Sequence, residues 1–296
     1  MVKIRSIHTE STPEPKATFT KGTSAIVDMD TYSVESPYQT GTNHVHVLLP
    51  GLLEAHRNYR VLYVLPVGGD ALGPDEAKLT WGTGVHAILG NFKSTKFTAI
   101  YENQARKYHL ICVFPDFATC PWFGDNLVDP KKRHESYLLQ VVLPFIERTY
   151  PTITVPQGRF LIGFSKSGFG ALGLHVRHPD IFGGSLSWDA PLMEKWPGRF
   201  GINEHFGSED AFSGWYMPTV LEKQASLLKQ DHIIVLAGYD LFQKPMDEAH
   251  ALLSRVGIPH QYLNGPSRPH HWYSGWVPKA LAALMSTAGN ETGAKP

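Results

Sequence analysis

A serine flanked by small residues lies where an apolar, strand-like run meets a small-residue, helix-like run, in Gly163-Phe164-Ser165-Lys166-Ser167-Gly168. A sharp strand-to-helix turn pushes a serine hydroxyl out of the backbone when the residues two before and two after it are small. Gly163 and Ser167 occupy those positions. The pattern therefore predicts that Ser165 is a nucleophile, with Ser167 in place of the usual glycine as its one defect.

A nucleophilic serine needs a base to take its proton and an acid to orient that base. The expected order along the chain is serine, acid, histidine. Asp240 follows the apolar run 231–238, and His270 follows the short run 261–263. We therefore expect Asp240 as the acid and His270 as the base.

Three alternatives to these two assignments stay open. His271 is adjacent to His270 in the sequence, and only one of them can point inward. Asp189, at the end of the run 184–188, and Asp247 are rival acids.

Two backbone N–H groups are expected to stabilise the oxyanion that forms when a serine attacks a carbonyl. The helix that follows Ser165 directs its first N–H groups toward the serine, which makes Lys166 the first donor. The second donor should follow the apolar run 60–66, where Gly68 is our choice and Val67 and Gly69 are neighbours that could serve instead.

Elements that could position these residues alternate along the chain. Continuous apolar runs predict buried strands, and runs with helical periodicity lie between them. This alternation predicts an α/β fold with a mostly parallel central sheet and helices on both faces. The predicted strands are 25–27, 44–50, 60–66, 109–116, 159–164, 184–188, 231–238 and 261–263, and the predicted helices are 81–92, 135–149, 168–178, 246–256 and 276–285.

The sequence predicts a single domain. Residues 1–24 are rich in Ser, Thr, Pro and Lys and are expected to be flexible or extended. Residues 25–290 form the predicted domain, with an irregular, aromatic-rich insertion at about 190–226. Trp122, Phe123, Trp188 and Trp215 are candidates for the substrate-pocket wall, and ordinary core packing is the alternative for each of them.

Composition excludes several classes of protein. Lys+Arg and Asp+Glu are 27 each, so no overall field attracts nucleic acid or anionic lipid. We see neither a signal peptide nor a transmembrane stretch, and we expect a cytoplasmic protein, although a mature secreted form would look much the same. Cys112 and Cys120 show no metal-site spacing. His44 and His46 have a zinc-compatible spacing, but no third ligand has a matching spacing, so we expect a polar strand face and predict no metal site.

The chain resembles the esterase D-like branch of α/β-hydrolases. The residues that carry the resemblance are the serine motif with its continuation Phe169-Gly170-Ala171-Leu172, then Val61–Leu65, Trp122-Phe123-Gly124-Asp125, Gly238-Tyr239-Asp240, and His270-His271-Trp272 with Trp276. That family usually has Met-Gly where this chain has Lys166-Ser167, and His-Gly where it has Pro66-Val67. Its histidine motif favours His270 over His271.

This resemblance implies an α/β-hydrolase fold and hydrolysis of carboxylic esters without a metal or cofactor. Its members include S-formylglutathione hydrolases, feruloyl and acetyl-xylan esterases, siderophore esterases and mycolyltransferases. We therefore expect a small-molecule or carbohydrate-linked ester as substrate, no nucleic-acid or membrane partner, and an oligomeric state that the sequence leaves open. An acyltransferase with the same triad and an inactive binding module of the same fold are the alternatives.

Overall fold

The computed structural model describes residues 16–24, 28–67, 95–119, 122–238, 240–272 and 274–288. Within this part of the chain, nine strands form one sheet in the order β1-β2-β3-β5-β4-β6-β7-β8-β9. The strands are β1 (Thr18–Lys21), β2 (Met29–Glu35), β3 (Thr42–Leu48), β4 (Arg60–Val64), β5 (Leu110–Pro115), β6 (Arg159–Phe164), β7 (Gly184–Trp188), β8 (Ile233–Ala237) and β9 (Gln261–Leu263).

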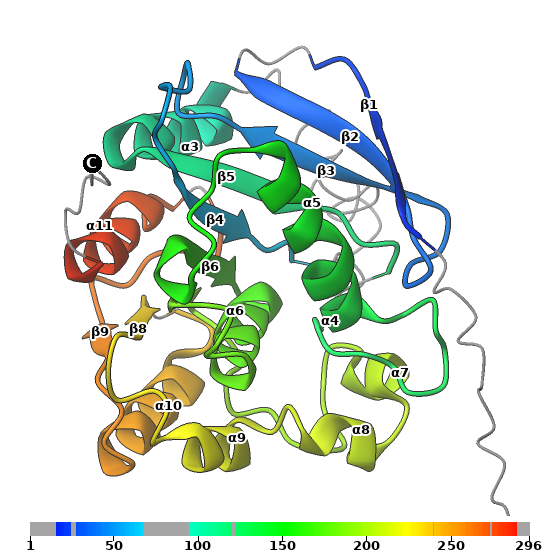
Figure 1. The fold of residues 1–296 in the computed structure, drawn as a ribbon. Coiled ribbons are helices and arrows are strands. Elements are labelled where there is room, and N and C mark those ends of the chain that lie inside the picture. Colours follow the sequence, from blue (N-terminus) through cyan, green and yellow to red (C-terminus); the bar gives the residue numbers. More distant parts are fainter. Residues whose placement is uncertain are drawn as a thin grey trace, which may run out of the picture.

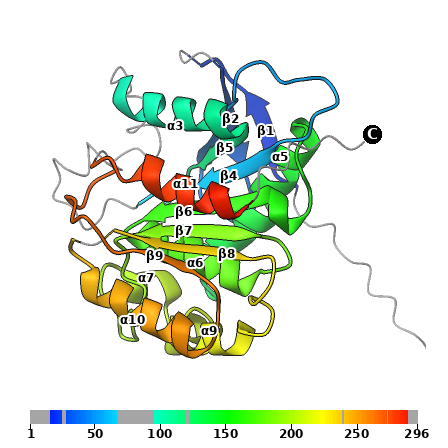
Figure 2. The same ribbon diagram turned by 90° about the vertical axis from the view of Figure 1, so that its left-hand side faces the viewer.

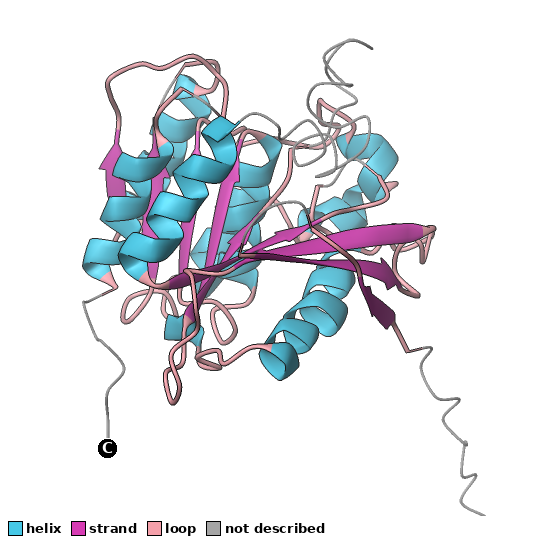
Figure 3. Cartoon of the chain, turned by 90° about the horizontal axis from the view of Figure 1, so that it is seen from above, coloured by secondary structure: helices cyan, strands magenta, loops and turns pink. Residues whose placement is uncertain are grey.

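The sheet has two parts that differ in strand direction. Strands β5, β4, β6, β7, β8 and β9 pair in parallel, while β1, β2 and β3 add an antiparallel edge that joins β5 through β3. Figure 3 shows the strong twist between these two parts. The apolar runs with no polar face lie in the parallel part, as predicted for strands buried on both sides.

Helices cover both faces of the sheet (Figures 1 and 2). One face packs against α3 and α11, and the other against α5, α6, α9 and α10. The helices are α3 (Thr95–Tyr108), α4 (His134–Ser136), α5 (Leu143–Thr149), α6 (Lys166–Arg177), α7 (Ile202–Phe206), α8 (Glu209–Ser213), α9 (Met217–Gln224), α10 (Gln243–Arg255) and α11 (Val277–Thr287), with a π-helical turn η1 (Tyr137–Val142) and a 3-10 turn η2 (Pro156–Gly158).

The predicted fold class is confirmed, and the local differences have simple causes. Residues 18–21 of the predicted lead-in form the edge strand β1, so this part is extended. The predicted helix 135–149 is divided by the π-helical turn η1, immediately before Pro144, which has no N–H to continue the α-helical pattern. The predicted strand 25–27 and helix 81–92 lie outside the described residues.

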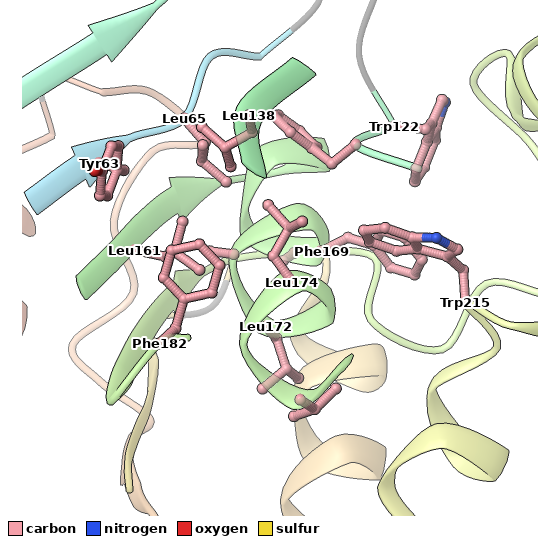
Figure 4. Packing of buried hydrophobic residues seen from close by; sticks show 14 of the residues in the cluster. Tyr63, Leu65, Trp122, Leu138, Leu161, Phe169, Leu172, Leu174, Phe182 and Trp215 are labelled. Carbon is pink, nitrogen blue, oxygen red and sulfur yellow. The ribbon is translucent and has the colours of Figure 1, made fainter. Parts of the chain in front are cut away.

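Helix α6 packs closely because one side of it is made of glycines. A Cβ on Gly170 would lie 2.1 Å from the Phe123 ring, and a Cβ on Gly173 would lie 2.5 Å from the Trp215 ring. These two aromatic side chains therefore occupy the space that larger helix residues would need. Figure 4 shows Trp215 beside Phe169 of α6 in this aromatic core.

Candidate active site

Ser165 lies in the turn between β6 and α6, as the sequence predicts. Its backbone has φ 55° and ψ −129°, a conformation that non-glycine residues rarely adopt. The turn is fixed on both sides, because the Ser165 N–H donates to the Trp188 carbonyl at 3.0 Å and its carbonyl accepts from the Gly168 N–H at 2.9 Å. The strained turn is thus held by the neighbouring strand and by the helix that it begins.

Ser167, which the sequence analysis treats as the one defect of the motif, stabilises this turn. Its hydroxyl donates to the Phe164 carbonyl at 2.8 Å and accepts from the Phe164 N–H at 2.9 Å. The residue opposite must be glycine, because a Cβ on Gly163 would lie 1.9 Å from the Ser167 carbonyl oxygen. The serine therefore joins the last residue of β6 to the first turn of α6.

The side chains of His270 and Asp189 form a hydrogen-bonded pair near Ser165. His270 Nδ1 lies 2.5 Å from Asp189 Oδ2, and Asp189 is fully buried directly after β7. The His270 ring also lies 4.4 Å from the ring of Phe164, the residue before the serine. The ends of β6 and β7 supply the serine and this carboxylate, and the segment after β9 brings the histidine to them.

The carboxylate of Asp189 is held by four hydrogen bonds. Three of them come from the backbone N–H groups of Asp240, Leu241 and Phe242, and the fourth comes from His270. Burial alone would raise the pKa of Asp189, but the hydrogen bonds from His270 and from the loop outweigh it and lower that pKa below its usual range. The carboxylate therefore stays ionised where an imidazolium would need a counter-charge.

The prediction of Asp240 as the acid does not match this geometry. Asp240 is exposed, and its carboxylate accepts the backbone N–H of His270 at 3.0 Å instead of contacting the imidazole. The loop after β8 presents its N–H groups, not its carboxylate, to the center of the site. Asp247, the other rival, is exposed on α10 and accepts from the Tyr262 hydroxyl at 2.5 Å.

His271 has a different environment from His270. His271 is exposed as a whole, and the partial burial of its ring, together with the charge of His270, lowers its pKa. His270 instead lies between the rings of Phe164, Trp188 and Phe242, at centroid distances of 4.4, 6.0 and 5.4 Å. Phe242, which the sequence gave no reason to select, contacts the ring of His270 and donates its N–H to Asp189.

Of the two expected oxyanion donors, only Lys166 is among the described residues. It is the first residue of α6, so its N–H lies at the end of the helix that faces Ser165. Gly68 lies outside the described residues, as does its neighbour Gly69, while Val67 is described and packs against the side of the sheet covered by α3 and α11.

The four aromatic residues proposed for a pocket wall are buried. Trp122, Phe123 and Trp188 are 0% exposed and Trp215 is 2% exposed. Phe123 and Trp215 pack on the glycine side of α6, and Trp188 stacks on Trp276 at 4.9 Å. The core-packing alternative describes these contacts better, because all four side chains are enclosed by other protein atoms and have almost no surface open to a ligand.

The His44 and His46 side chains share one side of β3, as their spacing predicts. Their rings are 6.2 Å apart, His46 Nδ1 is 2.9 Å from the Thr31 hydroxyl, and His44 pairs with Asp116 at 3.7 Å. Among the described residues, no group of three or more His, Cys, Asp or Glu side chains could hold a metal ion. In the same part of the chain, no helix is long and apolar enough to span a membrane.

Comparison with protein families identifies the group to which this site belongs. Residues 36–235 match the model of the family described as "Putative esterase". The chain belongs to this esterase family. Two Mycobacterium tuberculosis esterases, MT1326 and Rv1288, are 29% identical to it over 168 residues, which is 55% of this chain and 32% of theirs. The chain thus spans about a third of the length of these relatives.

Solved structures of esterases share the fold of this esterase-family chain. A ferulic acid esterase superposes with a TM-score of 0.65 at 18% identity, covering 92% of this chain and all of the other. An S-formylglutathione hydrolase from Agrobacterium tumefaciens gives a TM-score of 0.65 at 14% identity, covering 91% of this chain and 99% of the other. At these identities the likeness shows an α/β-hydrolase fold, and the family match places the chain among the esterases.

Proposed function

We propose that the protein hydrolyses carboxylic esters through an acyl-enzyme on Ser165, with His270 as the base and Asp189 as the acid that orients it. The observation that carries the proposal is the contact of His270 Nδ1 with the buried carboxylate of Asp189, beside the strained turn at Ser165. An Nδ1–H bonded to a carboxylate leaves Nε2 as the basic nitrogen, which is the tautomer that a serine base requires.

The first half of the reaction forms the acyl-enzyme. The Ser165 oxygen bonds to the ester carbonyl carbon while His270 Nε2 takes the hydroxyl proton. The N–H of Lys166 donates to the oxyanion, and Asp189 stabilises the imidazolium. The carbon–oxygen bond to the alcohol then breaks, and His270 gives its proton to the leaving alkoxide.

The second half releases the acid. Water attacks the acyl carbonyl carbon while His270 takes one of its protons, and the bond to the Ser165 oxygen breaks as that oxygen regains a proton from His270. The carboxylic acid leaves and the serine is restored. The similarity to ferulic acid esterases supports small-molecule esters, including esters attached to carbohydrate, as the substrate class.

The test compares the wild type with Ser165→Ala on short p-nitrophenyl esters. We expect the variant to lose roughly 10⁵-fold or more in kcat, since removal of a triad nucleophile has an effect of this order. Ser286→Ala, which removes an exposed hydroxyl on α11, is the matched control and should keep wild-type rates. Wild-type activity in the Ser165 variant would refute the assignment of the nucleophile.

A covalent label separates an inactive site from an unsuitable substrate. A fluorophosphonate should form a phosphorus–oxygen bond at Ser165 with loss of fluoride, and mass spectrometry of the labelled peptide would locate it. Failure to label, with no hydrolysis of any ester, would support a binding module instead. Ester products formed when an alcohol is added to the assay would identify an acyltransferase.

A further inference from the structure

Phe200 adopts a strained backbone conformation close to the site. Its φ is 59°, and Gly201, which follows it, has φ 85°. A bulky side chain is unfavourable in the left-handed region, so the surrounding structure must hold it there. Phe200 belongs to the insertion 190–226, outside the motifs that the sequence singled out.

Two buried donors hold the carbonyl of Phe200. The indole N–H of Trp122 donates to it at 2.9 Å, and the ammonium of Lys166 donates to it at 3.2 Å. The ammonium also lies 5.6 Å from the centroid of the Trp122 ring, which is a cation–π distance. Trp122 is 0% exposed and Lys166 is 3% exposed, so these contacts are formed away from bulk water.

Phe200 connects the insertion with the turn at Ser165 and with the surroundings of His270. Lys166 directly follows Ser165 in the turn. On the other side, the ring of Phe200 lies 5.8 Å from that of Phe242, which in turn lies 5.4 Å from the imidazole of His270. Phe200 is therefore tied through its carbonyl to the nucleophile turn and through its ring to the aromatic residue beside the base.

The ring of Phe200 is partly exposed, in contrast to the buried aromatic residues first proposed for the pocket wall. The guanidinium of Arg199 lies 5.0 Å from its centroid and pairs with Glu194 at 2.6 Å, which fixes the ring from outside. Leu241, in the loop that supplies the N–H groups for Asp189, is 66% exposed. Phe200 and Leu241 are thus apolar residues, at least partly open to solvent, in the two segments that flank Phe242, whose ring contacts His270.

We propose that Phe200 determines specificity for the apolar part of the ester, and that Lys166 and Trp122 position it through its carbonyl. The proposal rests on the esterase function proposed above and adds a specificity-determining residue and two positioning residues to it. The substrate class is an ester whose acyl group is an apolar chain, larger than acetyl.

The first experiment measures kcat/KM of Phe200→Ala on p-nitrophenyl acetate, butyrate and octanoate. We expect a loss of about tenfold or more on octanoate and less than about threefold on acetate, because only the longer chains can use the ring. Phe145→Ala removes a partly buried ring that packs on Phe19 and Tyr32, and it is the matched control. An equal loss on all three esters, or no loss, would overturn the proposal.

The second experiment tests the positioning role with Lys166→Met, which keeps the backbone N–H and the apolar stem. We expect Lys166→Met to lose about threefold to tenfold in kcat/KM on octanoate, mainly through KM, and to lose less on acetate than on octanoate. Trp122→Phe, which removes the other donor, should show the same order of losses at a smaller size. In a Phe200→Ala background, Lys166→Met should add little. Full additivity in this double-mutant cycle would show that Lys166 does not act through Phe200.

Two controls make the result unambiguous. The thermal midpoint and near-ultraviolet circular dichroism of each variant show whether it folds. If Lys166→Met does not fold, Trp122→Phe alone tests the positioning role. Ser165→Ala separates the two hypotheses. If it is inactive while the Phe200 and Lys166 variants keep the wild-type chain-length preference, the specificity proposal fails and the esterase proposal stands.

Discussion

Two histidines of this protein occupy similar hydrogen-bonded chains at opposite ends of strand β7. At the carboxyl end, His270 contacts the charged Asp189 and lies beside Ser165. At the amino end, His175 Nδ1 lies 3.0 Å from the Ser185 hydroxyl and Nε2 lies 3.1 Å from His232. A serine lies near each histidine, but of the two only His270 has an acid as its hydrogen-bond partner.

The difference determines what each imidazole can do. His175 is fully buried among neutral partners, and burial together with His232 lowers its pKa to about 3, so it stays neutral at physiological pH. His270 is partly exposed and has an ionised carboxylate at Nδ1, which can stabilise the imidazolium of the proposed mechanism. In that mechanism it is the paired carboxylate, which His175 lacks, that suits His270 to act as the base.

The largest expected effect separates these two histidines directly. His270→Gln should lose roughly 10⁵-fold in kcat, because glutamine can bond Asp189 but cannot take a proton. His175→Gln should keep kcat within about twofold while it lowers the free energy of unfolding by about 1–3 kcal/mol. Rates on p-nitrophenyl acetate and urea unfolding measure the two quantities, with His271→Gln as the control for the base. Loss of kcat in folded His175→Gln would break the distinction.

The second effect distinguishes the two aspartates. Asp189→Asn should lower kcat on the order of 10⁴-fold, since the amide cannot stabilise an imidazolium and favours the wrong tautomer. Asp240→Asn should lower it less than about tenfold, because only a hydrogen bond to the His270 backbone is weakened. A greater loss of kcat in Asp240→Asn than in Asp189→Asn would favour Asp240 as the acid, as the sequence predicts.

The smallest effect concerns acid stability. A histidine whose pKa is lowered by folding binds its proton more readily when unfolded, so its contribution to stability is lost as the pH falls below about 6.5. Folding lowers the pKa to about 4 for His205 and to about 3 for His175, so the pH range over which each histidine affects stability extends down to these values. The free energy of unfolding, measured with urea, should therefore fall as the pH is lowered from 6.5 to 4. The slope of this fall should be smaller in His175→Gln than in the wild type, by about 1.4 kcal/mol per pH unit. Equal slopes would contradict the low pKa of His175.

Much of this arrangement follows from local sequence patterns. The β6–Ser165–α6 unit could be predicted because an apolar strand, a small-residue turn and a helix are all short-range signals. The choice between Asp189 and Asp240 could not, because both follow buried strands at the same edge of the sheet. Which carboxylate meets the imidazole depends on the backbone of loop 240–242, whose N–H groups carry no residue-type signal.

The aromatic residues illustrate another limit of the sequence. Tryptophan is found both in pocket walls and in hydrophobic cores, so only the three-dimensional packing of Trp122 and Trp215 separates these roles. The sequence does not single out Phe200 as a site residue, because its left-handed backbone is not visible in the sequence and its two donors, Trp122 and Lys166, come from separate segments. The role of Ser167 also required the structure, because residue size alone gave no sign of its two hydrogen bonds to Phe164.

The hydrogen bonds that converge on Asp189 have a consequence for how activity appears during folding. They join the end of β7, the loop after β8 and the histidine that follows β9, and parallel strands pair only after long intervening segments are in place. Under the proposed mechanism, a chain that has formed the β6–α6 turn alone therefore has a nucleophile but no base. Ester hydrolysis would then report the completed assembly of the C-terminal half of the sheet, which helical circular dichroism alone would not distinguish from earlier folding stages.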